Sequence, residues 1–174
     1  MFGASAYNPN VGLFIVGGLF CKGLPTECYD GGSSGNKQAS GTWISTDFGE
    51  TFENRTQVRP GFALEEPCAV FLDDTHVLVA GGHYDGDATY SDATWILDLT
   101  DGDEGSWAPG GTMTKGRTRH TCKLITDANG DQKVLAIGGD SGTPGGTAVH
   151  NSDVDIYDVA TDTWSAGKHC LLMG

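Results

Sequence analysis

Short hydrophobic runs that end in a pair of glycines recur three times along the chain. They lie at residues 13–18, 77–82 and 134–139, and their starts are 64 and 57 residues apart. A short apolar run bounded by turn residues is typical of a buried β-strand. Paired glycines allow a sharp exit from the strand and a close approach of a neighbouring backbone. The sequence therefore predicts a structural role for Gly17, Gly18, Gly81, Gly82, Gly138 and Gly139.

Each run lies inside a longer unit in which four strands are expected. A strand-like segment and a tight turn precede the run, and a polar, glycine-rich loop follows it. A third strand is expected after each loop, at about 42–44, 94–97 and 154–157, and a fourth around Phe52, Trp107 and Trp164. The fourth-strand aromatic side chains are expected to fill the gap between adjacent twisted sheets, so Trp107 and Trp164 are interpreted as scaffold residues.

Repeated four-stranded units predict an all-β fold of the β-propeller type, in which each unit is one blade. The expected blades span about 4–55, 67–110 and 117–166, and residues 168–174 begin the next blade. Because propellers close with four to eight blades, three blades leave two open edges. We expect further blades or another chain to cover these edges.

The third unit resembles a kelch repeat. It carries Arg119-His120 before its first strand and Gly138-Gly139 after its second, and six residues separate Tyr157 from Trp164. The second unit departs from this pattern because Leu97 stands in place of the tyrosine and an acidic insertion delays the tryptophan. The pattern Arg-x-x-His-x-Cys at 117–122 is similar to secreted invertebrate-type kelch proteins. This resemblance implies a propeller scaffold for nearly the whole chain.

The first unit carries a different blade motif at the turn between its third and fourth strands. The segment 45–52 matches the Asp-box pattern Ser-x-Asp-x-Gly-x-Thr-aromatic, as found in sialidase-like (BNR) propellers. The side chain of Asp47 is expected to bond the backbone of its own hairpin and to fix the turn. Asp47 is therefore interpreted as structural.

Composition and charge exclude several classes of function. The 174 residues include 27 glycines, too many for long helices, and 23 acidic against 10 basic side chains give a net charge of −13. Such a chain is not expected to bind nucleic acid or an anionic membrane through a basic face. No apolar stretch is long enough to span a membrane. The first residues lack the pattern of a signal peptide, which favours an internal piece or a processed form of a longer protein.

The long loops at one end of the expected blades are the best candidates for a binding surface. Function in a propeller usually lies on loops, while the blades supply rigidity. The loops that follow the paired glycines and those that link successive blades are expected at the same end. Together they contribute the candidate binding residues Arg59, His83, Tyr84, Asp85, Arg117, Arg119 and His150. This mixed surface suits a protein or a glycan, and plain solvated loops remain the alternative.

Catalysis by this chain is not predicted. A sialidase-like site needs a cluster of arginines, and a galactose-oxidase-like site needs paired histidine and tyrosine ligands for copper. The five histidines lie one per segment without ligand spacing, and His120 and His169 are interpreted as repeat residues with satisfied hydrogen bonds. The alternative function is a fragment of a carbohydrate-active propeller enzyme whose catalytic residues lie outside this chain. No catalytic residue, cofactor or metal ligand is assigned.

Two acidic segments, 85–87 and 101–104, invite a calcium interpretation, because carboxylate oxygens gather there. Neither segment matches an EF-hand loop, and Asp-Gly pairs are ordinary turn formers. Calcium therefore stays the lesser alternative to the absence of a cofactor.

The cysteines and one sequon point to an extracellular protein. Cys21 and Cys28 lie in one loop and are predicted to form a disulfide, while Cys68, Cys122 and Cys170 occupy equivalent places in successive first strands. Equivalent positions on neighbouring blades are expected to lie too far apart for bridging, so these three are interpreted as buried apolar groups. Asn54 begins an N-glycosylation sequon. The sequence thus predicts a secreted glycoprotein that acts as a binding or assembly module.

Overall fold

The computed structural model describes residues 3–17, 41–57, 66–83, 90–100, 105–142 and 147–168. All the regular secondary structure in these ranges is β-strand. Sheet 1 consists of β1 (Ala4–Asn8), β2 (Gly12–Val16), β3 (Gly41–Ser45) and β4 (Glu53–Gln57). Sheet 2 consists of β5 (Cys68–Phe71), β6 (His76–Ala80), β7 (Thr94–Asp98) and β8 (Ser106–Pro109). Sheet 3 consists of β9 (Thr121–Thr126), β10 (Gln132–Ile137), β13 (Val154–Asp158) and β14 (Thr163–Ala166).

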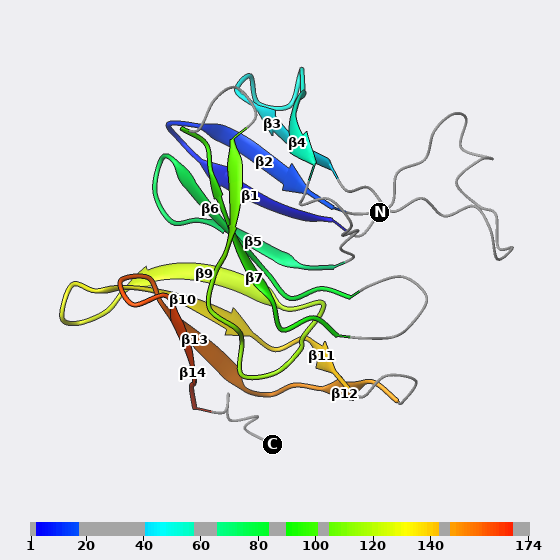
Figure 1. The fold of residues 1–174 in the computed structure, drawn as a ribbon, viewed down its shortest axis with the longest axis vertical. Helices are drawn as coiled ribbons and strands as arrows, with labels where there is room; N and C mark the ends of the chain where they lie inside the picture. Colours follow the sequence, from blue (N-terminus) through cyan, green and yellow to red (C-terminus); the bar gives the residue numbers. More distant parts are fainter. Residues whose placement is uncertain are drawn as a thin grey trace, which may run out of the picture.

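Each sheet is antiparallel and its strands are paired in chain order. The sheets follow one another through the molecule, from sheet 1 in blue and cyan to sheet 3 in yellow and red (Figure 1). The first strands are neighbours, since β1 contacts β5 and β5 contacts β9. The prediction of an all-β chain built from four-stranded units is confirmed.

The loop of the third unit holds a small hairpin that the sequence did not predict. It pairs β11 (Asp140–Ser141) with β12 (Val149–His150). The residues between the two strands are glycine, threonine, proline and alanine, which favour a loop prediction. Each strand has only two residues, which is too short for a pattern of alternation to be recognised.

The alternation of β6 shows how the core is built. Val77 and Val79 belong to a hydrophobic cluster shared with sheet 1, whereas Leu78 and Ala80 belong to a second cluster shared with sheet 3. Successive side chains of a strand point to opposite faces, so one fully buried strand serves two interfaces. We call the contact between sheets 1 and 2 the first interface and the contact between sheets 2 and 3 the second interface.

Gly81, after β6, and Gly139, after β10, lie against the segment 117–120, through which the chain passes from sheet 2 to sheet 3. Gly81 and Gly139 have φ angles of +68° and +79°. A Cβ atom added to Gly81 would lie 2.5 Å from Cε1 of His120, and a Cβ atom added to Gly139 would lie 2.8 Å from the Cβ atom of His120. Both glycines are therefore required by backbone conformation and by the close approach of one buried histidine.

Asp47 holds the turn between β3 and β4. Its carboxylate accepts hydrogen bonds from the Thr51 hydroxyl (2.6 Å), the Thr51 backbone N–H (2.9 Å) and the Ser45 hydroxyl (2.7 Å). The bonds from Thr51 are the main reason that the pKa of Asp47 lies well below its ordinary value. These are the bonds expected of this turn, and its assignment to the Asp-box class remains a prediction.

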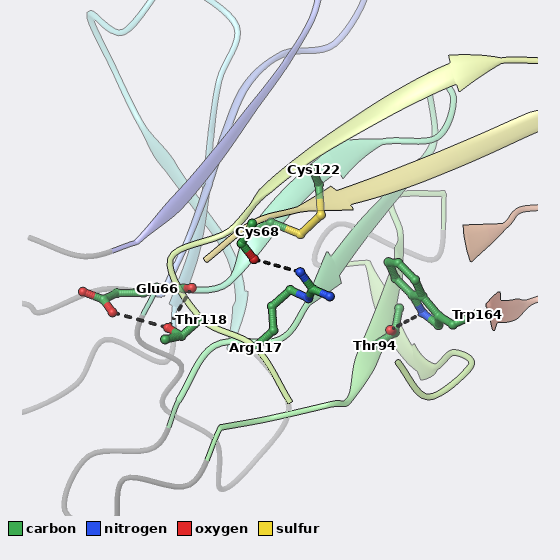
Figure 2. The surroundings of a disulfide bond; sticks show 8 residues. Glu66, Cys68, Thr94, Arg117, Thr118, Cys122 and Trp164 are labelled. Carbon is green, nitrogen blue, oxygen red and sulfur yellow. Dashed lines mark hydrogen bonds between the residues drawn. A yellow bond between two sulfur atoms is a disulfide. The ribbon is translucent and has the colours of Figure 1, made fainter. Parts of the chain in front are cut away.

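One expectation about the cysteines is wrong. Cys68 and Cys122 form a disulfide across the second interface, with their Cα atoms 5.6 Å apart (Figure 2). The expected spacing between equivalent positions was too wide. In the structure β5 and β9 lie next to each other, which brings Cys68 and Cys122, near the start of these strands, within bridging distance.

Several predicted residues fall outside the described ranges. These are Gly18, Cys21, Cys28, Arg59, Tyr84, Asp85, His169, Cys170 and most of the expected fourth-blade segment 168–174. The backbone of Asn54 lies in β4, opposite Trp43.

Candidate functional site at the loop end

The segment that links β8 to β9 is fixed to both of the sheets that it connects. The backbone of Arg117 donates to Ser91 O (3.0 Å) and accepts from Gly82 N (2.8 Å). Thr118 and Asp140 exchange two backbone hydrogen bonds of 2.8 and 2.9 Å. This linker therefore holds its side chains in fixed positions at the end of the second interface, where the long loops emerge.

Arg119 projects from this linker. Its backbone and that of Glu66 both have a φ angle of 55°, a left-handed conformation that is uncommon outside glycine. The two residues are joined by a backbone hydrogen bond (3.1 Å) and by a bond from Arg119 Nε to Glu66 Oε2 (2.7 Å). The hydrogen bond and charge of Glu66 raise the pKa of Arg119. Two non-glycine residues held in this strained region in direct contact are typical of functional sites.

Glu66 is the buried anchor of this arrangement. Its side chain is 9% exposed, whereas that of Arg119 is 61% exposed. The hydroxyl of Thr118 donates to both the backbone and the side chain of Glu66, each at 3.3 Å (Figure 2). His83 Nδ1 lies 3.9 Å from the same carboxylate. The buried carboxylate of Glu66 thus fixes the position of the exposed Arg119 side chain.

Asp140 anchors the second exposed side chain in the same way. Its carboxylate is 10% exposed and contacts His150 Nδ1 at 2.5 Å. His150 is 91% exposed, and the β11–β12 hairpin sets its position opposite Asp140. Arg119 Nη1 lies 3.4 Å from Asp140 Oδ2, which joins the two halves of the cluster. We call Glu66, Thr118, Arg119, Asp140 and His150 the loop-end site.

The loop-end site presents hydrogen-bond donors that are already oriented. Arg119 and His150 are exposed, while the carboxylates that hold them are buried. Side chains fixed before binding lose less conformational entropy when a partner arrives. The arrangement suits a ligand that offers carboxylate or carbonyl oxygens.

The structure brings three of the predicted binding residues, His83, Arg119 and His150, to one end of the molecule. The sequence analysis did not select Glu66 or Asp140 as binding residues. Glu66 lies two residues before β5, and its role depends on Arg119, which is 53 residues away in the chain. No local pattern signals such a contact.

Arg117 does not belong to this surface, so its prediction as a binding residue is wrong. Its side chain is fully buried, and its guanidinium donates to Gly138 O (2.8 Å) and lies 3.3 and 3.4 Å from Asp153 and Asp155. A buried arginine is stable only when it is paired, and the two aspartates of sheet 3 provide the pairing. Arg117 therefore fixes the linker to sheet 3 from inside.

His120 contradicts the expectation of satisfied hydrogen bonds. The residue is 7% exposed, and neither ring nitrogen has a hydrogen-bond partner within the described ranges. Burial, followed by the charge of Arg117, lowers the pKa of His120 to about 3. The ring is therefore neutral at physiological pH.

The structural residues of the third blade lie at the second interface. Trp164 packs against its hydrophobic cluster and donates from Nε1 to the Thr94 hydroxyl of sheet 2 (2.9 Å; Figure 2). Tyr157 is buried beside Trp164, with ring centroids 5.2 Å apart, and its hydroxyl donates to Asp162. Trp107 packs against the cluster of the first interface.

A hollow at the opposite end of sheet 1 has different chemistry. It lies between the β1–β2 and β3–β4 turns and is lined by Tyr7, Pro9, Asn10, Val11, Gly12, Leu13, Ser45, Thr46 and Phe48. Phe48 is strongly exposed, and no charged side chain is among these lining residues. Since it offers no anchored donor, this hollow is a weaker candidate than the loop-end site.

The comparisons with known proteins support a kelch-repeat fold. Residues 123–169 match the family model of the Kelch motif. The solved structure titled "Structure of YjhT" matches with a TM-score of 0.66 at 15% identity, over 99% of this chain and 52% of that one. This chain thus spans about half the length of that protein. None of the curated proteins matches the sequence.

The structural match confirms the predicted fold class, an all-β incomplete β-propeller, and the kelch motif itself is matched at residues 123–169. Within the described part of the chain, no helix has the length and apolar character needed to cross a membrane.

Proposed function

We propose that this chain is a non-catalytic kelch-propeller module that binds a protein partner at the loop-end site. The observation that carries the proposal is the pairing of exposed Arg119 and His150 with buried Glu66 and Asp140. The left-handed backbone of Glu66 and Arg119 adds support, because such strain is concentrated at binding and active sites. The partner offers carboxylate or carbonyl oxygens to these donors.

Binding of this kind requires no chemistry from the chain itself. Each buried carboxylate of the loop-end site is already engaged by a cation or a histidine, which suits an anchor better than a general base. The match to the Kelch motif favours the same interpretation, because function in a propeller usually lies on its loops while the blades supply rigidity.

The proposed setting is extracellular. The sequon at Asn54 and the predicted Cys21–Cys28 disulfide support it, as does the Cys68–Cys122 disulfide, because disulfides persist in oxidising compartments. We further propose that additional blades or another chain cover the outer faces of sheets 1 and 3, since propellers avoid open edges.

A phage-displayed library of random dodecapeptides tests the binding role. We expect the chain to enrich peptides rich in Asp and Glu, and Arg119→Ala to weaken their binding at least tenfold. Lys123→Ala is the matched control, because it removes the charge of an exposed cation on β9 outside the loop-end site. Failure to enrich acidic peptides, or equal binding by the Arg119→Ala variant, contradicts the proposal.

A further inference from the structure

Three metal-ligating side chains meet inside the second interface, beneath the loop-end site. The Sγ atoms of Cys68 and Cys122 and a ring nitrogen of His120 all lie within 4.8 Å of one another. Cys68 and His120 are buried, and Cys122 is partly exposed. The two sulfurs are joined as a disulfide in this structure. The cluster therefore exists in an oxidised form, and reduction creates two thiols next to a histidine.

The state of His120 is the second observation. Gly81 lies close to its ring and Gly139 close to its Cβ atom, yet neither ring nitrogen has a hydrogen-bond partner in the part of the chain that the structure describes. A buried polar group without a partner costs about 1–3 kcal/mol, and a disulfide sulfur is at best a weak acceptor. The oxidised form thus leaves an imidazole without a hydrogen-bond partner, a good metal ligand, beside the two sulfur atoms.

We propose that Cys68, His120 and Cys122 form a zinc site when their disulfide is reduced. Two thiolates and one imidazole are an established ligand set for Zn²⁺, with a water molecule as the fourth ligand. The partial exposure of Cys122 leaves one side of the cluster accessible to that water. The site is distinct from the loop-end site and does not depend on the binding function proposed for it.

The geometry requires only small movements. With Zn–S bonds of about 2.3 Å in a tetrahedron, the two sulfurs lie about 3.8 Å apart, which is ordinary contact for two reduced sulfurs. In the same tetrahedron the histidine nitrogen lies about 3.5 Å from each sulfur, so it must approach the sulfurs by at most about 1.3 Å. The Cα atoms of the two cysteines, 5.6 Å apart, already suit either state.

The charges favour Zn²⁺ over Cu⁺. Two thiolates cancel the charge of Zn²⁺, whereas Cu⁺ leaves one uncompensated negative charge in a buried place. Arg117 lies in the surroundings of the disulfide, and Asp153 and Asp155 already neutralise its charge (Figure 2). Its Nε is a buried donor without an acceptor among the described residues.

The change from the disulfide to the zinc site consumes two electrons and then releases two protons. A dithiol reductant supplies two electrons and two protons, the bond between Cys68 and Cys122 breaks, and the reductant becomes a disulfide. Zinc binding to the two thiols then releases two protons to solvent. In the reverse direction a disulfide oxidant accepts two electrons from the bound thiolates and two protons from solvent, becomes two thiols, and leaves the Cys68–Cys122 bond re-formed and the metal released.

The test uses the full chain with the variants Cys21→Ser, Cys28→Ser and Cys170→Ser combined, so that the only cysteines are Cys68 and Cys122. This parent is reduced with a phosphine and titrated without oxygen with Co²⁺, which reports thiolate coordination by its absorption, and then with Zn²⁺. We expect one equivalent of Co²⁺ to bind and Zn²⁺ to displace it. The same protein before reduction is expected to bind neither ion.

Variants separate a true site from loose thiol binding. His120→Ala is expected to weaken Zn²⁺ binding at least tenfold, and Cys68→Ser to abolish it. His76→Ala is the control, because His76 is a half-exposed histidine on β6 that bonds Asp73 and lies outside the cluster. A second measurement needs no variant of the site. One equivalent of Zn²⁺ is expected to protect both thiols of the parent from alkylation, which mass spectrometry detects.

The proposal is overturned if the reduced parent shows no stoichiometric Zn²⁺ binding and no protection of its thiols. Equal affinity in the folded His120→Ala variant also overturns it. Binding of Cu⁺ without binding of Zn²⁺ overturns the assignment to zinc.

Discussion

The two interfaces of this molecule share the strands of sheet 2 but are held together differently. At the first interface the contact is mainly apolar, with Phe14 and Phe71 packed edge to face. The hydrogen bonds seen there among the described residues include those from Asn8 and Asn10 to Asp74. The second interface adds the Cys68–Cys122 disulfide and a buried arginine between two aspartates.

The difference follows the position of the loop-end site. The residues of this site come from both sides of the second interface, Glu66 from just before sheet 2 and Asp140 from the β11–β12 hairpin that follows β10 of sheet 3. A site that spans two sheets keeps its geometry only if the sheets do not move relative to each other. The added links therefore explain how Arg119 and His150 can remain oriented.

Removal of Arg117 is expected to have the largest effect. The Arg117→Ala variant leaves Asp155, which is 1% exposed, as a buried charge with no cation, and this should cost about 3–5 kcal/mol of unfolding free energy. Denaturant unfolding measures the loss. Arg119→Ala removes the same kind of side chain from an exposed position and should cost about 1 kcal/mol or less. Equal losses would refute the view that Arg117 is an internal anchor.

Loss of the disulfide is expected to come next. Cys68 and Cys122 are 54 residues apart, and opening a loop of this size frees unfolded-state entropy worth up to about 4 kcal/mol. The double variant Cys68→Ala, Cys122→Ala should lower stability by about 2–4 kcal/mol in metal-free buffer. Adding a reductant should destabilise the wild type but not this variant, and an effect on both would locate the redox-sensitive bond elsewhere.

Acid is expected to weaken the second interface through Asp153. Burial raises the pKa of this residue, but the hydrogen bond from Lys115 and the charge of Arg117 outweigh burial and keep the pKa below its ordinary value. The folded-state pKa is thus lower than the unfolded one, so the stabilisation is present above about pH 4 and is lost as pH falls through the folded pKa. Asp153→Asn should be less stable than wild type at pH 7, and the difference should shrink below pH 4. A difference independent of pH would rule out this pairing.

The rim of the first interface is expected to give the smallest effect. Asp74 accepts hydrogen bonds from Asn8 and Asn10 but is exposed to solvent, so Asp74→Ala should cost about 1 kcal/mol or less. Thermal unfolding measures this change. A loss as large as that of Arg117→Ala would mean that the two interfaces depend equally on polar contacts.

Patterns that repeat within the sequence predicted the fold well. The three Gly-Gly runs mark second strands of the sheets. An uninterrupted apolar run predicts a strand that is buried on both faces, and β6 is such a strand. The aromatic positions near Trp107 and Trp164 likewise mark fourth strands. Such features depend on residues close in the chain, so they can be recognised without coordinates.

Contacts between sheets could not be predicted in this way. The motif Arg-x-x-His-x-Cys at 117–122 can be recognised in the sequence, but the sequence does not show that its Arg, His and Cys side chains lie in three different environments. Arg117 is enclosed by aspartates, His120 lies beside sulfur, and Cys122 is bonded to the preceding sheet. The error about Arg117 arose because a loop arginine is normally exposed, and only burial reveals the exception.

The sequence by itself determined a chain of four-stranded antiparallel units, since strand periodicity, turn residues and paired glycines are local properties. The tertiary structure alone decided which charges are buried, which cysteines are joined and which residues form the loop-end site. The physical reason is the range of the interactions. Hydrogen bonds within a hairpin join neighbours in the chain, whereas the bond from Arg119 to Glu66 spans 53 residues and exists only after two sheets have packed together.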